Sequence, residues 1–221
     1  VCRRVGRQKR ESTLSLTRRA LAFSLASTGL WPHARAQDAA GVVFSLSLEP
    51  DSLDPTTAAA AAVGQVVHYN VLEGLTRIEE DGRVSPLLAE SWQVSPDGRQ
   101  YRFALRRDVR FHDGAPFDAR AVRFSFERAR AEGSTNKARK TLFGNITGIE
   151  TPDDHTVVLA LRNADAQTLF RLGENTAVIL HPDSAAQAAT RPVGTGPFRL
   201  ERWDKGERIV LARSPSHRHA G

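Results

Sequence analysis

The chain has 221 residues, of which 40% are hydrophobic and 25% charged, a globular composition that excludes collagen, coiled coils and whole-chain disorder. The formal net charge of +6 is concentrated at one end. Residues 1–36 hold eight of the 31 Lys and Arg residues and one of the 25 Asp and Glu residues, so residues 37–221 carry 23 bases and 24 acids, a net charge of −1. A neutral body lacks the positive surface that phosphate-backbone binding requires, and we expect no nucleic-acid partner.

The first thirty-six residues have the order of a secretory signal peptide. A basic stretch precedes the apolar run 20–30, and Ala34-Arg35-Ala36 offers small residues at the two positions of an A-x-A cleavage site. The apolar run is about half as long as the ~20 residues that a transmembrane helix needs, so a membrane anchor is not expected. Adjacent Arg18 and Arg19 favour the twin-arginine export route, with the general secretory route left open.

We predict that the mature protein begins at Gln37 and lies in the periplasm, because signal peptidase cleaves after such a small-residue pair. The only cysteine, Cys2, lies in the leader, so the mature chain has no disulfide. N-terminal sequencing of the exported protein checks the cleavage site. An unprocessed chain in the cytosol would contradict the prediction.

The remaining residues predict short strands, turns and two or three helices. Residues 42–48 (VVFSLSL) are β-branched and apolar with a period of two, which predicts a first strand. Apolar residues recur at helical spacing over 57–72, which predicts a packed helix. A type I turn signal at 95–98 (SPDG) lies inside 92–105, so we expect a β-hairpin there with one buried face.

Further along the chain, Asp118 is placed to cap a helix over 119–131. The run TVVLAL at 156–161 predicts a strand. Residues 199–200 and 209–211 predict a final pair of strands.

Eight short motifs follow one another between residues 42 and 215: SLDP (52–55), LEGL (72–75), PLLAESW (86–92), SPDG (95–98), FALR (103–106), VRFHDG (109–114), DDHT (153–156) and GTGPF (194–198). No single motif is specific. In this order and approximate spacing, they resemble the family 5 extracellular solute-binding proteins, the periplasmic oligopeptide-, dipeptide- and nickel-binding components of ABC importers.

The resemblance implies an α/β fold, the N-terminal lobe of a type II-like periplasmic binding protein with an inserted second subdomain. Residues 42–74 and 180–215 would form a discontinuous first subdomain, and residues 75–179 the inserted second one. Members of the family are well over twice as long, and a second lobe closes over their ligand. We therefore expect that the C-terminal lobe is missing through truncation or frameshift, with residues 216–221 as an anomalous tail.

The resemblance also implies a ligand-binding segment. In the family, an extended stretch just after the Leu-Asp-Pro turn runs beside the bound peptide and offers it backbone N–H and C=O groups. Here that stretch holds the predicted ligand-binding residues, which are Thr56, Thr57, Ala58, Ala59 and Ala60. The structural alternative is the start of an alanine-rich helix.

Other patterns favour structural roles. Aromatic residues on the buried phase of the predicted strands are expected in the core: Trp92, Tyr101, Phe103 and Phe111. His112 beside Asp113 is expected in a turn, because a metal site needs three or four ligands and no others lie at suitable spacing. Residues 194–196 (GTG) predict a tight turn, since the other parts of a phosphate-binding loop do not accompany them.

The function implied by the resemblance is a periplasmic substrate-binding component of an ABC importer, a monomer that captures a peptide or similar small solute for a permease in the inner membrane. No cofactor, metal or enzymatic activity is expected, because residues 37–221 contain neither a Gly-x-Ser-x-Gly motif nor a cysteine nucleophile. A non-functional remnant of such a protein and an exported enzyme remain alternatives. The ligand's identity stays open, because its determinants in the family are spread over both lobes.

Overall fold

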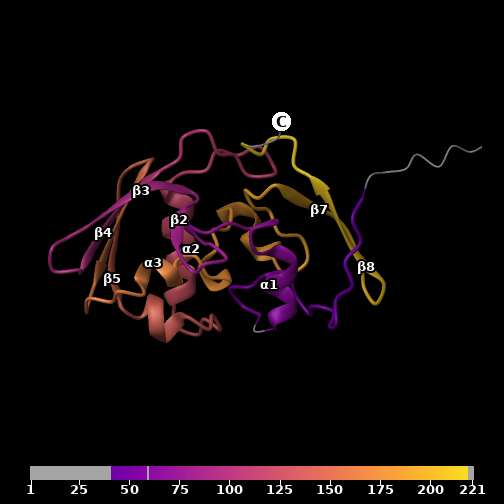
Figure 1. The fold of residues 1–221 in the computed structure, drawn as a ribbon, viewed down its shortest axis with the longest axis horizontal. Helices are drawn as coiled ribbons and strands as arrows, with labels where there is room; N and C mark the ends of the chain where they lie inside the picture. Colours follow the sequence, from indigo (N-terminus) through magenta and orange to yellow (C-terminus); the bar gives the residue numbers. More distant parts are fainter. Residues whose placement is uncertain (1–40, 59, 219–221) are drawn as a thin grey trace, which may run out of the picture. The chain divides into compact units, whose positions relative to one another are not determined.

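The structure is a computed structural model that describes residues 41–58 and 60–218, and residues from Ser45 onward form one unit (Figure 1). The predicted signal peptide lies outside the described residues, so its cleavage and the export route stay predictions. Within the described part, no helix is long and apolar enough to cross a membrane.

Short strands and helices follow one another along the described residues. The helical elements include one π-helical turn, η1, and two 3-10 turns, η2 and η3. In chain order the elements are α1 (Ala61–Val67), β1 (Thr76–Ile78), β2 (Val84–Pro86), β3 (Ala89–Val94), β4 (Gln100–Leu105), α2 (Ala119–Arg130), η1 (Arg139–Phe143), β5 (Ile146–Asp153), β6 (Thr156–Leu161), α3 (Thr168–Arg171), η2 (Asn175–Ala177), η3 (Pro182–Gln187), β7 (Phe198–Asp204) and β8 (Arg208–Arg213).

A four-stranded antiparallel sheet with the strand order β3-β4-β6-β5 forms one part of the structure. The predicted hairpin is confirmed: β3 and β4 pair with Trp92 opposite Phe103, and the turn between them closes with the N–H of Gly98 donating to the carbonyl of Ser95 at 2.9 Å. Gly98 has a φ of 67°, a left-handed conformation that glycine adopts without a steric cost. The predicted strand at 156–161 is β6.

Helix α2 packs against β5 and β6 and begins where the sequence predicted. The side chain of Asp118 accepts hydrogen bonds from the N–H groups of Arg120 and Ala121 at 2.9 and 3.1 Å. These bonds satisfy two of the amides that have no partner in the first turn of a helix. The cap therefore fixes the start of α2, and Val122 and Phe126 are buried against the sheet.

Buried apolar side chains form two clusters. The larger cluster, core 1, contains residues from Leu75 to Ile179. The smaller cluster, core 2, joins residues 53–72 to residues 178–188, and apolar residues of β7 and β8 pack against it. Of the aromatic residues expected in the core, Tyr101, Phe103 and Phe111 are buried, while Trp92 is partly buried at the edge of core 1.

The final strand pair is confirmed, since β7 and β8 form an antiparallel ribbon in which Leu200 lies opposite Leu211. In Figure 1 this ribbon is the yellow hairpin that carries the labels β7 and β8. The inward residues of the ribbon pack on core 2, which gives a short hairpin the apolar support that it needs.

The predicted strand at 42–48 is wrong, because the chain there is irregular. Val42, Val43, Phe44 and Leu48 are between 71% and 95% exposed. A strand is stabilised by hydrogen bonds to a neighbouring strand. No strand among the described residues pairs with this stretch, so its alternating pattern alone does not produce one.

The predicted helix over 57–72 is too long at both ends, since α1 covers only Ala61–Val67. At the beginning, residues 55–57 form a turn instead of a helix. At the end, Tyr69 has a φ of 61°, a left-handed conformation that an α-helix does not allow. The N–H groups of Val71 and Leu72 both return to the carbonyl of Val67, which closes the helix.

Candidate functional site

The predicted ligand-binding segment begins in a turn organised by Asp54, which is 2% exposed. One carboxylate oxygen of Asp54 accepts the N–H of Thr56 at 2.9 Å. The backbone carbonyl of Asp54 accepts the N–H groups of Thr57 and Ala58 at 3.2 and 3.0 Å. Three consecutive amides are therefore bound to one buried residue, which fixes the backbone at the start of the segment.

Helix α2 and the loop after it hold this turn from the other side. One guanidinium nitrogen of Arg128 lies 2.8 Å from the second carboxylate oxygen of Asp54, and another donates to the hydroxyl of Thr56. The hydroxyl of Thr135 donates to the carbonyl of Thr57 at 3.1 Å. The turn is thus tied to an element more than seventy residues away in the sequence.

The five predicted residues differ in exposure. Thr56 is buried, Ala58 is half-buried, and Thr57 and Ala60 are exposed. Ala59 lies outside the described residues. Ala60 is extended, with φ −71° and ψ 136°, and is the residue before α1. The segment therefore leads from a fixed turn to the helix start at Ala61, which lies just after it, and none of its described residues is helical. Its contact with a ligand stays a prediction.

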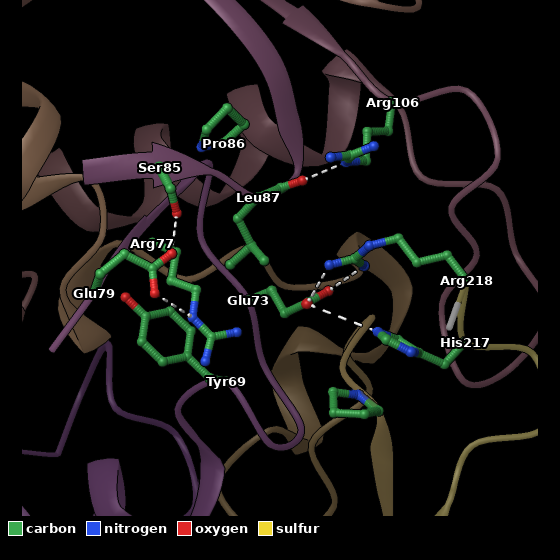
Figure 2. A pocket seen from close by; sticks show the side chains of 11 residues that line it. Tyr69, Glu73, Arg77, Glu79, Ser85, Pro86, Leu87, Arg106, His217 and Arg218 are labelled. Atoms are coloured by element: carbon green, nitrogen blue, oxygen red, sulfur yellow. Dashed lines mark hydrogen bonds and ion pairs between the residues drawn. The ribbon is translucent and has the colours of Figure 1, made fainter. Parts of the chain in front are cut away.

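A polar cavity of about 320 Å³ lies elsewhere in the unit, around the carboxylate of Glu73 (Figure 2). Its lining comes from the stretch between α1 and β1, from β1 and β2 with the residue after each, from the residue after β4, from the residue before β7 and from the stretch after β8. The lining residues are Tyr69, Glu73, Arg77, Glu79, Ser85, Pro86, Leu87, Arg106, Pro197, His217 and Arg218.

Glu73 is buried at 3% exposure and has charged and polar partners. Its Oε1 accepts from Arg218 at 2.7 Å, and its Oε2 accepts from a second nitrogen of Arg218 at 3.0 Å. The hydroxyl of Thr195 donates to Oε2 at 2.8 Å. Nε2 of His217 lies 3.9 Å from Oε1. Figure 2 shows Arg218 and His217 pointing toward this carboxylate.

These partners keep Glu73 ionised. Burial, the largest single influence, raises the pKa of its carboxyl, but hydrogen bonds from His217, Arg218 and Thr195 and the charge of Arg218 outweigh it, so the pKa is lowered. A buried carboxylate is costly unless it is paired and hydrogen-bonded, and Glu73 is both.

Arg77 and Glu79, which also line the cavity, add one charge of each sign, with Nε of Arg77 3.9 Å from Oε2 of Glu79. The guanidinium of Arg77 lies 5.0 Å from the ring centre of Tyr69, and the Tyr69 hydroxyl donates to the carbonyl of Gly173 at 2.7 Å. Nε of Arg106 donates to the carbonyl of Leu87 at 2.7 Å. The arrangement can hold a polar or charged group by complementary charge.

The sequence does not predict this cavity. Glu73 belongs to the LEGL motif, and residues 216–221 are expected only as an anomalous tail. Glu73 and Arg218 are 145 residues apart in the sequence, so no local spacing predicts their ion pair.

His68 lies beside Tyr69, with the two rings stacked at 3.7 Å between centroids. Burial, the largest cause, lowers the pKa of His68 to about 4; a hydrogen bond with Gly173 acts in the opposite direction, and the charge of Arg77 adds to the lowering. His68 is therefore neutral in the folded protein at pH 7.

We predict that His68→Gln makes the stability less dependent on pH between 6.5 and 4. An unfolded histidine takes up a proton near pH 6.5, whereas folded His68 does so only near pH 4. Its share of the stability is complete above pH 6.5 and is lost as the pH falls toward 4, an effect of roughly 2 kcal/mol. Urea denaturation at pH 7 and pH 4.5 measures it, and equal losses in the parent and the variant would contradict the prediction.

His112 has a structural role, and the turn expected at this position is confirmed. Nε2 of His112 is 2.9 Å from the carbonyl of Gly196, and the N–H of Gly194 donates to Nδ1 at 3.3 Å. The N–H of Gly114 donates to the carbonyl of Phe111 and closes the turn. The side chain thus ties this turn to the turn at 194–196. The described residues contain no group of three or more His, Cys, Asp or Glu placed to hold a metal ion.

Comparison with known proteins decides the family. Residues 83–219, more than half of the chain, match the model of the bacterial extracellular solute-binding proteins, family 5 (Middle). The chain belongs to this family.

Curated relatives agree with this assignment. The probable D,D-dipeptide-binding periplasmic protein DdpA of Escherichia coli K12 is 30% identical over 195 residues, which cover 80% of this chain and 36% of the relative. The glutathione-binding protein GsiB of Salmonella typhimurium LT2 is 31% identical over 195 residues, which cover 86% of this chain and 37% of the relative. The chain thus spans little more than a third of the length of these relatives.

Solved structures show the same fold. The PBP AgaA from A. tumefacien R10, solved with agropinic acid, superposes with a TM-score of 0.71 at 32% identity, covering 77% of this chain and 35% of that one. DppA from Helicobacter pylori, solved with the peptide STSA, superposes with a TM-score of 0.68 at 30% identity, covering 76% of this chain and 38% of that one. The expected fold class is confirmed: the chain is part of an α/β lobe of a type II periplasmic binding protein.

Proposed function

We propose that the protein to which these residues belong is the periplasmic substrate-binding component of an ABC importer. It captures a peptide or a similar small solute without chemical change and delivers it to a permease in the inner membrane. The observation that carries the proposal is the family match over residues 83–219. Relatives named for D,D-dipeptide and glutathione binding, and a neighbour solved with the peptide STSA, favour peptides as the solute class.

We further propose that the unit is divided into two subdomains. Residues 42–74 and 180–215 form the first, and residues 75–179 the second. Core 2 supports this division, because most of its residues lie in 53–72 and 180–188 and apolar residues of β7 and β8 pack against it, while Val178 and Phe124 of the second subdomain adjoin it. Core 1 lies within residues 75–179. Each subdomain would then have its own apolar core.

The ligand would run beside the segment Thr56, Thr57, Ala58, Ala59 and Ala60. Its small side chains allow a peptide backbone to approach closely, and exposed Ala60 is already extended, as strand addition requires. The turn at Asp54 and its bond to Arg128 support this role, because a segment that is fixed before binding loses less conformational entropy when the ligand arrives.

Calorimetric titration of residues 37–221 with di- to pentapeptides tests the proposal. We expect weak binding, with a Kd of about 1 mM, because the ligand contacts one wall and stays half solvated. A missing charge-assisted hydrogen bond alone weakens binding by ~1.5–3 kcal/mol. Absence of saturable binding up to about 10 mM would contradict a contribution of this lobe alone to peptide binding. A low-micromolar Kd would contradict the expectation that one lobe does not suffice.

Two proline variants connect the binding to the segment. Ala60→Pro removes the N–H donor of an exposed residue, and the φ of −71° at Ala60 suits proline. Ala61→Pro is the matched control, because proline is accepted at the first helical position and Ala60 is extended, as a residue before proline must be. We expect a several-fold rise in Kd for Ala60→Pro alone, corresponding to about 1 kcal/mol for one hydrogen bond.

A further inference from the structure

The carboxylate of Glu73 holds a guanidinium group in a two-point arrangement. Both oxygens accept from Arg218, at 2.7 and 3.0 Å, and Thr195 donates to one of them at 2.8 Å. Paired N–H bonds of this kind fit the planar fork of a guanidinium, whereas an ammonium group offers only a point charge. The side chain of Arg218 is 6% exposed, so the pair is almost fully removed from water.

We propose that Glu73 and Thr195 form a binding site for a guanidinium group, and that Arg218 of the chain itself occupies it. We call these two residues the guanidinium site. An arginine side chain of a peptide, or a free guanidinium compound, binds there when Arg218 is removed. The site is separate from residues 56–60, because none of them lines the cavity around Glu73.

The guanidinium site is built by residues that do not depend on Arg218. The carbonyl of Glu73 accepts the N–H of Ile179 at 2.8 Å, and the carbonyl of Gly74 accepts the N–H of Leu88 at 3.3 Å. These bonds hold the backbone of Glu73 between core 1 and core 2. The backbone that carries the carboxylate is therefore fixed without Arg218.

Thr195 is held equally firmly. The N–H of Gly196 donates to the carbonyl of Val71 at 3.1 Å, and the turn at 194–196 is also bound to His112. The hydroxyl that faces Glu73 is thus placed by the backbone of the turn. Together, these contacts make a preformed acceptor for a cation.

The site needs a cation because it is buried. Glu73 is 3% exposed, and an ionised carboxylate in such a place is unfavourable without a partner. Arg218 places a permanent positive charge against both oxygens of Glu73, Thr195 is neutral, and Nε2 of His217 lies 3.9 Å from Oε1. The cavity of about 320 Å³ beside the pair leaves room for another cation to enter.

Chemical rescue of Arg218→Ala in the full 221-residue chain tests the inference. We expect the melting temperature to fall by about 10 °C, because one partner of a buried ion pair is removed. Methylguanidinium at millimolar concentration should restore part of the loss in a saturable way. Methylammonium should restore less, because it cannot form the paired bonds.

Two variants serve as controls. Arg218→Ala combined with Glu73→Gln should show no rescue, because the acceptor has lost its charge. Arg213→Ala removes an exposed arginine five residues earlier. This variant should have the melting temperature of the parent, and methylguanidinium should not change it. If Arg218→Ala is unfolded in buffer, recovery of the circular dichroism signal on adding methylguanidinium replaces the melting temperature. Equal responses with and without Glu73→Gln, or no response at all, would overturn the inference.

Discussion

Replacing Gly194 with alanine should destabilise the fold by roughly 3 kcal/mol or more, because the backbone around the turn at 194–196 leaves no room for a side chain. A Cβ on Gly194 would lie 1.9 Å from the carbonyl oxygen of Val71 and 2.8 Å from the Leu72 side chain. The obstacle is backbone, so no side-chain rotation relieves it. Urea denaturation followed by circular dichroism measures the loss.

Gly148→Ala is the matched control for this substitution. A Cβ on Gly148 would meet the Cβ of Ala160 at 3.5 Å, an ordinary van der Waals contact. We expect this variant to be as stable as the parent or slightly more so, by up to ~1 kcal/mol, because alanine restricts the unfolded chain. A stability for Gly194→Ala within 1 kcal/mol of that of Gly148→Ala would disprove the close approach of the turn to residue 71.

Replacing Arg128 with methionine should cost about 3 kcal/mol, because it leaves the buried carboxylate of Asp54 without a cation. Asp54 is 2% exposed and lies 2.8 Å from Arg128, whose side chain is 29% exposed. Hydrogen exchange of the Thr56, Thr57 and Ala58 amides should accelerate at the same time, since the turn loses its tie to α2. Chemical denaturation and amide exchange give the two measurements.

The control for this variant is Arg123→Met, which removes an exposed arginine from the same helix. It should change stability by less than about 0.5 kcal/mol. Combining Arg128→Met with Asp54→Asn should recover part of the loss, because the unpaired charge is removed. If Arg128→Met is no less stable than Arg123→Met, the ion pair does not hold the turn.

Local signals predicted the elements that local physics controls. The turn at 95–98 specifies its hairpin through residues next to one another, and Asp118 caps α2 through its own side chain. The predicted strand at 42–48 is absent because a strand needs a neighbouring strand to pair with, and the local sequence pattern does not show whether one is present. The helix at 57–72 was overextended because Tyr69 adopts a left-handed conformation that helix propensity does not reveal.

The polar cavity around Glu73 could not be predicted from the sequence. Glu73, Thr195 and Arg218 come together only because the chain returns beside residues 70–72 through the turn at 194–196. The two glycines at 194 and 196 predict a tight turn, but not the close approach of Gly194 to the backbone of Val71 or of Gly196 to that of Asn70. Such contacts between distant segments have no periodicity or spacing in the sequence. The resemblance to a family predicted the segment 56–60, and the Asp54–Arg128 pair that supports it became visible only in three dimensions.

Whether a peptide binds beside residues 56–60 is tested most directly by nuclear magnetic resonance of isotope-labelled residues 37–221. Increasing concentrations of a tripeptide are added, and the shifts of the backbone amides are followed. We predict saturable shifts at Thr57, Ala58 and Ala60 and in the first turn of α1, with a Kd of about 1 mM. Shifts confined to other parts of the chain, or none up to about 10 mM peptide, would contradict the proposed role of this segment in solute binding.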